Sequence, residues 1–330
     1  MSADRSIERI LTTQIKLRQL VLLKAVADCG TVSRAAEALH MSQPAVSKTI
    51  HELEALLEEP LFERTSKGVT PTVFGRHVIR YARSVHAELR RAADELTALR
   101  HGGGGKLTIG SYMVALPQLL PRALSIFFDR DDTARITVVD GNKEKLLAGL
   151  VAGEIDIVVG RMTDLGDMEW ITQVPLYFEP IVLVTGSQNP LAKRDPLVAA
   201  DLLDQEWIMP HATSVVRTPI NLFLMREGLP RPRRIIETVS VPLIRSLLAQ
   251  RPAVAALPWQ VVQADIQQGL LTQLPIDIGY PALPVGISTN DTFKLSDAAI
   301  SMIACLREAA AELYHAAPGA ARVQAPTAAS

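Results

Sequence analysis

Apolar residues recur at helical spacing in three runs between residues 17 and 57. The first run, which holds Leu17, Leu20, Val21, Leu23 and Val26, predicts a helix over 17–30 that ends at Gly30. The second predicts a helix capped by Thr31 or Ser33. After a two-residue break, the third predicts a helix from its cap, Ser42, to about Leu57.

The second and third helices have the pattern of a helix-turn-helix. Ala35 and Ala36 are small enough to let the two helices cross closely at a steep angle. On the third helix, Val46 and Ile50 are expected to face inward, and the opposite face is polar and lacks acids until Glu52. Such a face can enter a major groove, where Gln reads adenine, Ser bonds a base or phosphate, and Lys neutralises phosphate. The alternative is a three-helix corner with a solvated face.

The following residues, "PLFERTSKGVTPT" over 60–72, predict two short strands joined by a turn at 66–68, which is a wing beside the helices. Basic side chains near the tip of such a wing can reach phosphates or a minor groove. The helix-turn-helix and the wing together give these candidate DNA-contacting residues: Ser33, Arg34, Ser42, Gln43, Pro44, Ser47, Lys48, His51, Arg64, Lys67 and Thr70.

A helix of about 28 residues is predicted to start after its cap, Thr72. Its apolar positions step by three or four, close to a heptad, while five arginines lie off that stripe. A small domain cannot bury such a stripe alone, so the helix is expected to pair with a second copy and to place two recognition helices on two half-sites. The apolar positions are Phe74, Val78, Tyr81, Val85, Leu89, Ala92, Leu96 and Leu99.

The stretch "RHGGGGK" over 100–106 follows this helix. It does not fit a phosphate-binding loop, because no Ser or Thr follows the lysine and no strand precedes it. A flexible hinge is the better interpretation.

From residue 107 onward, strand and helix patterns alternate, which predicts an α/β fold. The segment "IDIVVG" is continuously apolar, as expected for a strand buried on both faces. We expect one strand over 177–186 to lead to a second set of units, and a strand over 283–289 to return before a final helix over 298–314. Two crossing strands that join two lobes make a hinged clamshell.

Composition adds limits to this organisation. The chain has 330 residues, 48% apolar and 21% charged, which is typical of a soluble globular protein with two or three domains. No run of about 18 apolar residues predicts a membrane span, and the first residues lack the apolar core of a signal peptide. Cys29 and Cys305 show no metal-binding spacing and are expected to be buried thiols, so the cytoplasm is the expected compartment.

Charge is unevenly spread along the chain. Residues 1–100 carry 15 Lys and Arg against 12 Asp and Glu, a net of +3, while the remainder carries 19 against 23, a net of −4. A basic front half is what a protein that meets a polyanion needs, although the asymmetry is small.

Two other classes compete with a DNA-binding regulator. An enzyme on a two-lobed scaffold is not supported by a cofactor loop, a metal cluster or a local nucleophile motif, and no cofactor is expected. A transport-type binding protein is disfavoured by the missing export signal and by the 100 residues before the clamshell.

The order of these elements resembles a LysR-type transcriptional regulator over about residues 16–315. The resemblance rests on Ala35-Ala36, Leu39, "SQPAVSKTIHELE" from Ser42, "PLFERTSKGVTPT" and Gly75. The two-lobed region resembles periplasmic solute-binding proteins. A weaker similarity, around "GSYMVALPQLLP" and "VVGRM", is to the branch that controls aromatic-acid catabolism or sugar-binding-protein genes.

This resemblance implies a homotetramer, a dimer of dimers, that binds an interrupted inverted repeat in double-stranded promoter DNA and bends it. It also implies a small coinducer in the clamshell, with RNA polymerase as a further partner. The fold implied is multidomain, with these parts: an N-terminal extension of open role (1–15), a winged helix-turn-helix (16–71), a dimerisation helix (72–100), a hinge (101–106), effector subdomain I (107–183 and 287–316), effector subdomain II (184–286) and a disordered tail (317–330).

In open α/β lobes, ligands bind beyond the carboxyl ends of strands and at helix N-termini. Hydroxyls and helix-end N–H groups there make a cradle for a carboxylate, and Arg161 could clamp it with two bonds. Asp140 is an alternative, structural partner for Arg161, His211 is left as a loop residue, and a sugar effector or none stays open. The candidate effector-binding residues are Ser111, Tyr112, Gly141, Asn142, Gly160, Arg161, Thr213, Ser214, Ser240 and Val241.

Overall fold

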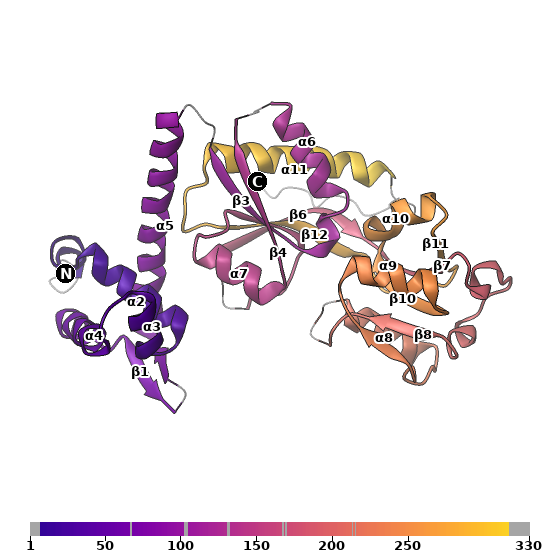
Figure 1. Ribbon diagram of the computed structural model, residues 1–330, viewed down its shortest axis with the longest axis horizontal. Helices are drawn as coiled ribbons and strands as arrows, with labels where there is room; N and C mark the ends of the chain where they lie inside the picture. The colour runs from indigo at the N-terminus through magenta and orange to yellow at the C-terminus, as the bar shows by residue number, and fades with distance from the viewer. Residues whose placement is uncertain are drawn as a thin grey trace, which may run out of the picture.

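The structure is a computed structural model of the 330-residue chain, and it describes residues 7–66, 68–101, 105–130, 133–166, 168, 170–212, 214 and 216–316. Lys67, Thr213, residues 102–104 of the predicted hinge and the predicted tail therefore lie outside the described residues. From left to right in Figure 1, a small helical domain is followed by one upright helix and two α/β lobes.

The N-terminal domain has the predicted helix-turn-helix and wing. Its core joins Leu22 and Val26 of the first helix to Ala35 and Ala36 of the second and to Val46 and Ile50 of the third. Leu17, which the sequence placed in the apolar stripe, is instead 46% exposed, because the buried face runs through Leu22. The elements are η1 (Ile10–Gln14), α2 (Leu17–Cys29), α3 (Val32–Ala38), α4 (Gln43–Leu57), β1 (Phe62–Thr65) and β2 (Gly68–Pro71).

Side-chain caps start three helices at the residues that the sequence predicted. The hydroxyl of Thr31 accepts a bond from the N–H of Arg34 at 3.3 Å, and that of Ser42 accepts one from Ala45 at 3.4 Å. Thr72 accepts from the N–H of Gly75 at 2.8 Å, at the start of α5 (Val73–His101). Each cap satisfies a backbone donor that the first turn leaves unpaired.

The described part of the N-terminal extension is folded onto this domain. Ile10 and Ile15 pack against the buried cluster of Leu23, Leu53 and Ile79, which joins α2 and α4 to α5. The opposite side of the extension exposes Ile7 and Leu11. Residues 7–15 therefore add apolar contacts to the base of α5.

The long helix α5 buries a face that lies beside the predicted apolar stripe. Ile79, Ala82 and Ala87 are at most 2% exposed and contact the rest of the chain. Phe74 and Val78 of the predicted stripe are half-buried. The stripe above them is open to solvent, at the large side chains Tyr81 (60% exposed), Val85 (40%), Leu89 (47%) and Leu96 (66%).

Lobe I is a five-stranded sheet with helices on both faces. The strand order is β4-β3-β5-β12-β6, in which β4, β3 and β5 are parallel and β12 runs antiparallel to its neighbours. The helices α6 and α11 cover one face and α7 covers the other, so both faces of β5 are buried, as predicted. The bounds are β3 (Lys106–Ser111), η2 (Met113–Ala115), α6 (Leu119–Phe128), β4 (Arg135–Asp140), α7 (Lys143–Val151), β5 (Ile157–Arg161), β6 (Ile171–Glu179), β12 (Leu283–Asn290) and α11 (Asp297–Ala316).

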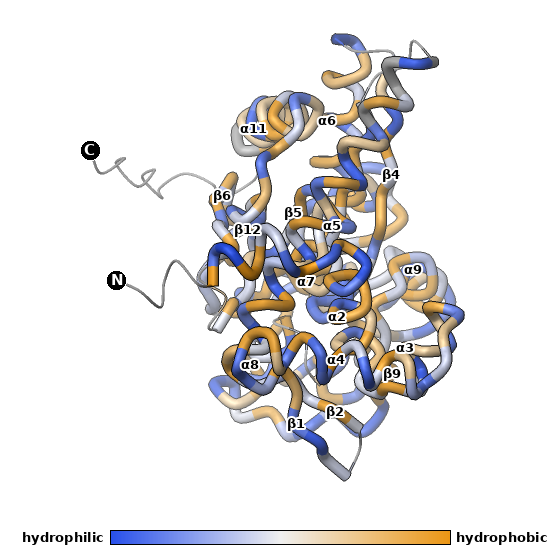
Figure 2. Tube along the Cα trace, turned by 90° about the vertical axis from the view of Figure 1, so that its left-hand side faces the viewer, coloured by the Kyte–Doolittle hydropathy of each residue, from blue (hydrophilic) through white to orange (hydrophobic). Residues whose placement is uncertain are grey.

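Lobe II repeats this arrangement with a second five-stranded sheet, in the order β11-β7-β10-β8-β9. Helix α8 lies over one face, while α9 and α10 pack against the other. In Figure 2, the lobe I helices α11 and α6 show hydrophobic positions interleaved with hydrophilic ones, as expected for amphipathic helices that cover a sheet. The bounds in lobe II are β7 (Ile181–Gly186), η3 (Pro190–Lys193), η4 (Ala199–Leu202), β8 (Glu206–Met209), α8 (Arg217–Arg226), β9 (Ile235–Glu237), α9 (Val241–Gln250), β10 (Ala253–Pro258), α10 (Trp259–Gln267) and β11 (Leu271–Gln273).

The predicted single strand over 177–186 is wrong. It is two strands in two sheets, because β6 ends at Glu179 and pairs with β12, whereas β7 starts at Ile181 and pairs with β10. Pro180 stands between them and has no N–H to continue a ladder. The predicted lobe limits at 183/184 and 286/287 consequently cut through β7 and β12, and the chain changes lobe at Pro180 and ahead of Leu283.

Both cysteines are free thiols. Cys305 is buried as predicted, but Cys29 is only half-buried. Within the described ranges, no helix combines the length and the apolar character needed to cross a bilayer.

Candidate DNA-binding surface and effector cleft

The N-terminal end of α4 is an exposed polar surface on a buried apolar support. Gln43 and Lys48 are exposed and Ser47 is half-buried, while Val46 and Ile50 beneath them are at most 6% exposed. The backbone N–H groups of this first turn also point outward, which suits a phosphate. Nine of the eleven DNA candidates are exposed: Ser33, Arg34, Ser42, Gln43, Pro44, Lys48, His51, Arg64 and Thr70.

The charged side chains of α4 are only loosely tied within the helix. The ammonium group of Lys48 lies 3.9 Å from the carboxylate of Glu52, and its side chain is 78% exposed. The ring of His51 lies 3.3 Å from Glu54. Exposed pairs of this kind are weak, so both side chains can turn toward a phosphate at little cost.

Glu54 has a role that the sequence analysis missed. Its carboxylate accepts bonds from the backbone N–H groups of Leu61 at 2.9 Å and Phe62 at 3.3 Å. These bonds fix the start of β1 to the last turn of α4, and so hold the wing at a set angle to the polar surface. A glutamate that follows the recognition face looks like a solvated residue in sequence, because its backbone partners carry no side-chain signature.

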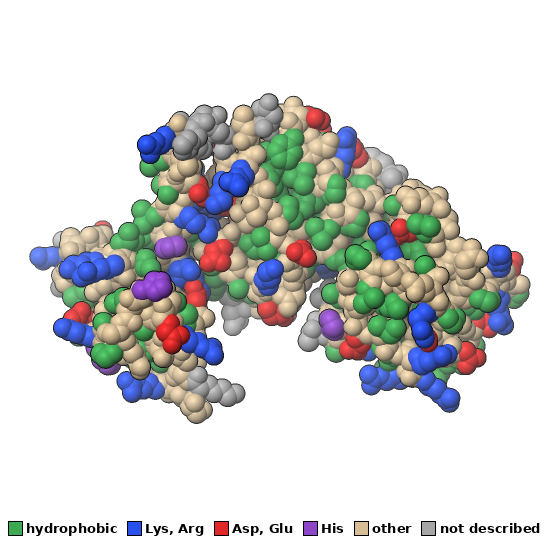
Figure 3. Space-filling model, viewed as in Figure 1, with side chains coloured by type: hydrophobic (Ala, Val, Ile, Leu, Met, Phe, Trp, Pro, Cys, Tyr) green, Lys and Arg blue, Asp and Glu red, His purple; other side chains and the backbone are tan. Residues whose placement is uncertain are grey.

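The wing is held from its other side by glycine. The N–H of Val69 donates to the carbonyl of Gly30 at 2.9 Å, and a Cβ on Gly68 would stand 2.2 Å from that oxygen. Only glycine permits this approach of β2 to the end of α2. Arg64 and Thr70 project from the two strands, and Figure 3 shows Lys and Arg side chains on the outer surface of this domain, at left.

In lobe I, the carboxyl ends of three parallel strands bring together four of the effector candidates. Ser111 pairs with Asp140 on β4 and with Val159 on β5, which puts Tyr112 and Gly141 at the same edge. Gly160 has φ +136°, and a Cβ there would lie 2.7 Å from that of Tyr112. Burial raises the pKa of the Tyr112 phenol, which stays neutral at physiological pH.

The other candidates lie at helix starts. Asn142 caps α7 by accepting from the N–H of Lys145 at 3.1 Å. On lobe II, Ser214 precedes α8 and its hydroxyl accepts from Val216 at 3.4 Å. Ser240 is exposed at the start of α9 but makes no side-chain cap, and Val241 is half-buried behind it.

Arg161 lies at the junction of the two lobes. It is 5% exposed, and one of its terminal nitrogens, Nη1, donates to the carbonyls of Leu283 at 2.9 Å and Glu179 at 3.4 Å. The alternative partner Asp140 is not the one observed. The second terminal nitrogen, Nη2, has no hydrogen-bond partner among the described residues.

Glu179 completes a buried polar group at this junction. Its carboxylate accepts from the backbone N–H of Gln260 at 2.6 Å and so caps α10 of lobe II from the end of β6 in lobe I. Burial raises the pKa of Glu179 to about 7 and lowers that of Arg161 to about 10, each against the opposite pull of the other's charge. A group that titrates near neutral pH therefore lies where the two lobes join.

The two lobes contact each other at this junction through polar groups and through the apolar side chain of Met113. The N–H of Trp259 donates to the carbonyl of Pro180 at 3.0 Å, and the amide of Gln118 reaches Gln260 and Gln263 at 3.2 and 3.0 Å. Met113, just after Tyr112, packs against the apolar cluster of lobe II. A ligand at the strand ends of lobe I would therefore lie beside contacts that set how the lobes close.

Two cavities lie away from these candidates. One, of about 440 Å³, lies between α5 and lobe I and is lined by Arg90, Asp94, Asp156 and Phe127 among others. The second, of about 510 Å³, lies on lobe II beside α8 and is lined by Met209, Arg217 and Met225 among others. Of the effector candidates, the nine that the structure describes line neither cavity. Within the described residues, no three His, Cys, Asp or Glu side chains gather as metal ligands would.

Comparison with known proteins agrees with this arrangement. Residues 17–76 match the family model described as bacterial regulatory helix-turn-helix protein, lysR family, and residues 100–311 match the LysR substrate binding domain. The chain is 32% identical to the HTH-type transcriptional regulator PcaQ of Agrobacterium fabrum over 301 residues, which cover 91% of this chain and 97% of PcaQ. It is 31% identical to the regulator GbpR of Azospirillum brasilense over 300 residues, which cover 91% of this chain and 88% of GbpR.

A solved structure shares the fold. Full-length CbnR in complex with its target DNA superposes with a TM-score of 0.56 at 24% identity, and the match covers 89% of this chain and all of that one.

Proposed function

The chain belongs to the LysR family of transcriptional regulators, and on that premise we propose that it binds an interrupted inverted repeat in promoter DNA and responds to a small carboxylate between its lobes. Its named relatives are transcriptional regulators, so it is a DNA-binding regulator with an effector-binding domain and not an enzyme.

The observation that carries the DNA part of the proposal is the polar end of α4. Gln43, Ser47 and Lys48 face solvent from a helix whose underside is buried, and Glu54 and Gly68 hold a wing beside it. A rigid helix end of this kind fits a major groove, with Arg64 and Lys67 of the wing reaching the flanking backbone.

Two copies are needed to bind an inverted repeat. The exposed apolar face of α5 gives each chain a surface for a second copy, and two-fold pairing would place the recognition helices on two half-sites. A dimer of two such dimers, in contact with RNA polymerase at the promoter, is the full assembly that we propose.

The effector part of the proposal rests on one arginine and two helix starts, whose chemistry suits an anion. Arg161 keeps an unpaired terminal nitrogen, α7 begins at the Gly141–Asn142 edge, and α9 begins without a side-chain cap at Ser240. Helix N-termini and an arginine fork are favourable partners for a carboxylate. We place Ser111, Tyr112, Gly160, Thr213, Ser214 and Val241 in the walls of the same cleft.

A footprint on the DNA upstream of the protein's own gene tests the first part. The purified full chain should protect two half-sites and should prefer this fragment over random duplex at moderate salt. A monomer that shows no preference would contradict the proposal.

A thermal-shift screen with carboxylates, and with sugars as the competing class, tests the second part. A ligand present at 100 times its dissociation constant should stabilise the fold by about 2.7 kcal/mol. Arg161→Ala should abolish that shift for the active carboxylate while half-site binding persists, and Arg161→Lys should restore it only in part, because lysine lacks the planar fork. An unchanged ligand shift in Arg161→Ala would remove Arg161 from the effector site.

A further inference from the structure

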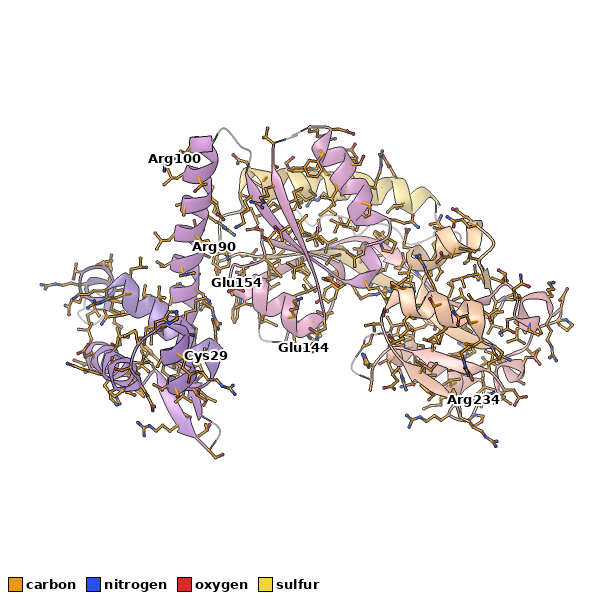
Figure 4. The ribbon with its side chains drawn as sticks, viewed as in Figure 1. Cys29, Arg90, Arg100, Glu144, Glu154 and Arg234 are labelled. Atoms are coloured by element: carbon orange, nitrogen blue, oxygen red, sulfur yellow. The ribbon has the colours of Figure 1, made fainter. Side chains whose placement is uncertain are left out.

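The helix α5, which we call the linker helix, is docked on lobe I through charged contacts. These contacts, which we call the linker contact, lie at the end of the lobe opposite to the strand ends at Ser111, Gly141 and Gly160, which we call the effector edge. They join Lys24, Ser84, Arg90 and Arg91 on one side to two loops of lobe I, residues 152–156 and 292–294, on the other. Arg90 and Glu154 are labelled in Figure 4, where they lie between α5 and lobe I.

The first loop meets two cations and a close backbone approach. Arg90 donates to the carbonyl of Gly153, and the ammonium group of Lys24 lies 3.5 Å from the carboxylate of Glu154. Gly153 has φ +66°, and a Cβ there would lie 2.5 Å from that of Ala87, so the loop rests directly on the helix.

Arg91 joins both loops. Its guanidinium lies 3.3 Å from the carboxylate of Asp156, donates to the carbonyl of Lys294 and stacks 5.2 Å from the ring centre of Phe293. Asp156 also accepts from the N–H of Thr108 on β3 at 2.8 Å, so one carboxylate ties the linker helix to the central sheet.

The same two elements connect this contact to the effector edge. Helix α7 begins after Asn142 and ends at Val151, just before Gly153, while β5 begins after Asp156 and ends at Gly160 and Arg161. A nine-residue helix spans about 14 Å as a rigid rod, so movement of its first turn is passed to its last. Loop 152–156 is the short segment between the two.

We propose that the linker contact is a regulatory latch: lobe I holds the DNA-binding domain at a set angle through loops 152–156 and 292–294, and movement at the start of α7 releases or tightens that hold. The sign of the charges suits a reversible latch. Cationic side chains of α5 and α2 meet carboxylates of lobe I and a backbone carbonyl just after α7. These ion pairs are part-exposed, so salt weakens their attraction. The latch rests on the proposed function, because it matters only if the domain that it holds binds DNA.

A cysteine pair measures whether the latch is closed. The hydroxyls of Ser84 on α5 and Thr292 on lobe I are 3.5 Å apart, so Ser84→Cys with Thr292→Cys should form an intramolecular disulfide on mild oxidation. Each single variant, which retains the native Cys29 and Cys305, should form none. Glu154→Lys, added to the pair, should slow the cross-link about three-fold or more, because repulsion from Lys24 replaces attraction. Glu312→Lys, the same change of charge on α11 of lobe I and away from the linker contact, should leave the rate unchanged.

The bend of the upstream DNA fragment then reports the consequence. The cross-linked chain and the Glu154→Lys variant should bend the fragment to different angles, while their affinities for a single half-site stay within about two-fold of each other. The latch would be overturned by equal cross-linking rates with and without Glu154→Lys. It would also be overturned if the cross-linked chain and the Glu154→Lys variant bent the fragment to the same angle. Absence of any specific DNA binding by the wild-type chain would instead defeat the proposed function, and the cross-linking rates would still report on the contact.

Discussion

At the scale of single residues, Gln43 and Ser47 lie one turn apart on the exposed side of α4. Each can bond a base edge only if the helix enters a major groove. Gln43→Ala and Ser47→Ala should therefore each cost about 1–3 kcal/mol of discrimination between the preferred and a mutated half-site, measured by competition gel shift.

Arg64→Ala is the matched control for this measurement, because Arg64 lies on the wing strand and is proposed to contact only the DNA backbone. It should weaken binding to all sequences equally and should reduce the slope of log affinity against log salt by about 1. Lys67→Ala should behave as Arg64→Ala does. Unchanged discrimination in both α4 variants would remove Gln43 and Ser47 from base recognition.

Glu179 should give the fold a distinctive pH dependence. Its pKa is raised by burial from 4.5 to about 7, so the folded chain holds the proton more tightly than the unfolded chain does. The resulting stability is fully present below about pH 4.5 and is lost as the pH rises through about 7. Glu179→Gln keeps the oxygen that accepts from Gln260 but cannot ionise, so it should raise stability at pH 8 by up to about 3 kcal/mol.

Denaturant unfolding between pH 5 and pH 8 checks this effect. The gain in Glu179→Gln should shrink toward zero at the acid end, and the exposed variant Glu63→Gln should show no comparable trend. A gain that is equal at pH 5 and pH 8 would mean that the side chain of Glu179 does not titrate in this range.

Single residues also show where sequence reasoning stops. Arg161, the last residue of β5, was predicted to clamp a carboxylate or to pair with Asp140, and its side chain is buried, at 5% exposure. Its observed partners are backbone carbonyls 18 and 122 residues away, and a carbonyl has no sequence signature. The candidates at Ser111, Tyr112 and Gly160 were easier to place, because parallel strands bring their carboxyl ends to one edge by rule.

At the scale of elements, α5 begins against the wing through a glycine. A Cβ on Gly75 would lie 1.9 Å from the carbonyl oxygen of Leu61, which also accepts from the N–H of Thr72 at 3.0 Å. Gly75→Ala should therefore push α5 away from β1 and destabilise the N-terminal domain by about 2–4 kcal/mol.

Thermal unfolding followed by circular dichroism measures that loss. Gly105→Ala is the matched control, since a Cβ there meets its nearest neighbour, Ala298, at 3.4 Å, which is an ordinary contact. It should change stability by less than about 1 kcal/mol. If Gly75→Ala were as stable as Gly105→Ala, close packing of α5 on Leu61 would not be a feature of the native domain.

Local pattern predicted most elements well, and it failed where two strands follow each other with a single residue between them. The caps Ser42 and Thr72 act at short range, so their sequence signal is direct. The run over 177–186 contains Glu179 and Pro180, and its halves on either side of Pro180 pair with different sheets. Which sheet a strand joins depends on partners about 70 to 110 residues away, and periodicity does not carry that information.

At the scale of the whole molecule, the order of elements was enough to predict a winged helix-turn-helix, a long helix and two lobes. The docking of α5 on lobe I was not predicted. The sequence placed the arginines of α5 off the apolar stripe but gave them no partner, because nothing in it links Arg91 to Asp156 or to the loop at 292–294. Contacts between bodies depend on shape and on the path of the hinge, which a pattern of residues does not fix.

The remaining surface of α5 decides how many chains act together. The helix has 29 residues and is about 44 Å long, and its arginine face is occupied by lobe I. Tyr81, Val85 and Leu89 lie one turn apart on the free face and are 40–60% exposed. A helix with one face docked and an apolar stripe left in water is stabilised by a second copy. Arg90 and Arg91 are engaged by lobe I, while the guanidinium of Arg80 lies 4.9 Å from the ring centre of Tyr81, at one end of this stripe.

Leu89→Glu should therefore convert the protein to a smaller species in sedimentation velocity at micromolar concentration, with the fold intact by circular dichroism. Ile300→Glu, at a 54% exposed apolar position on α11, is the matched control and should leave the mass unchanged. Because the second half-site is bound at a high effective concentration only when the chains are joined, affinity for the full repeat should fall by about 10²-fold or more, while affinity for one half-site should hold. If the wild-type chain and Leu89→Glu had the same mass, the free face of α5 would not be the pairing surface, and the two recognition helices would have to be brought together through the lobes.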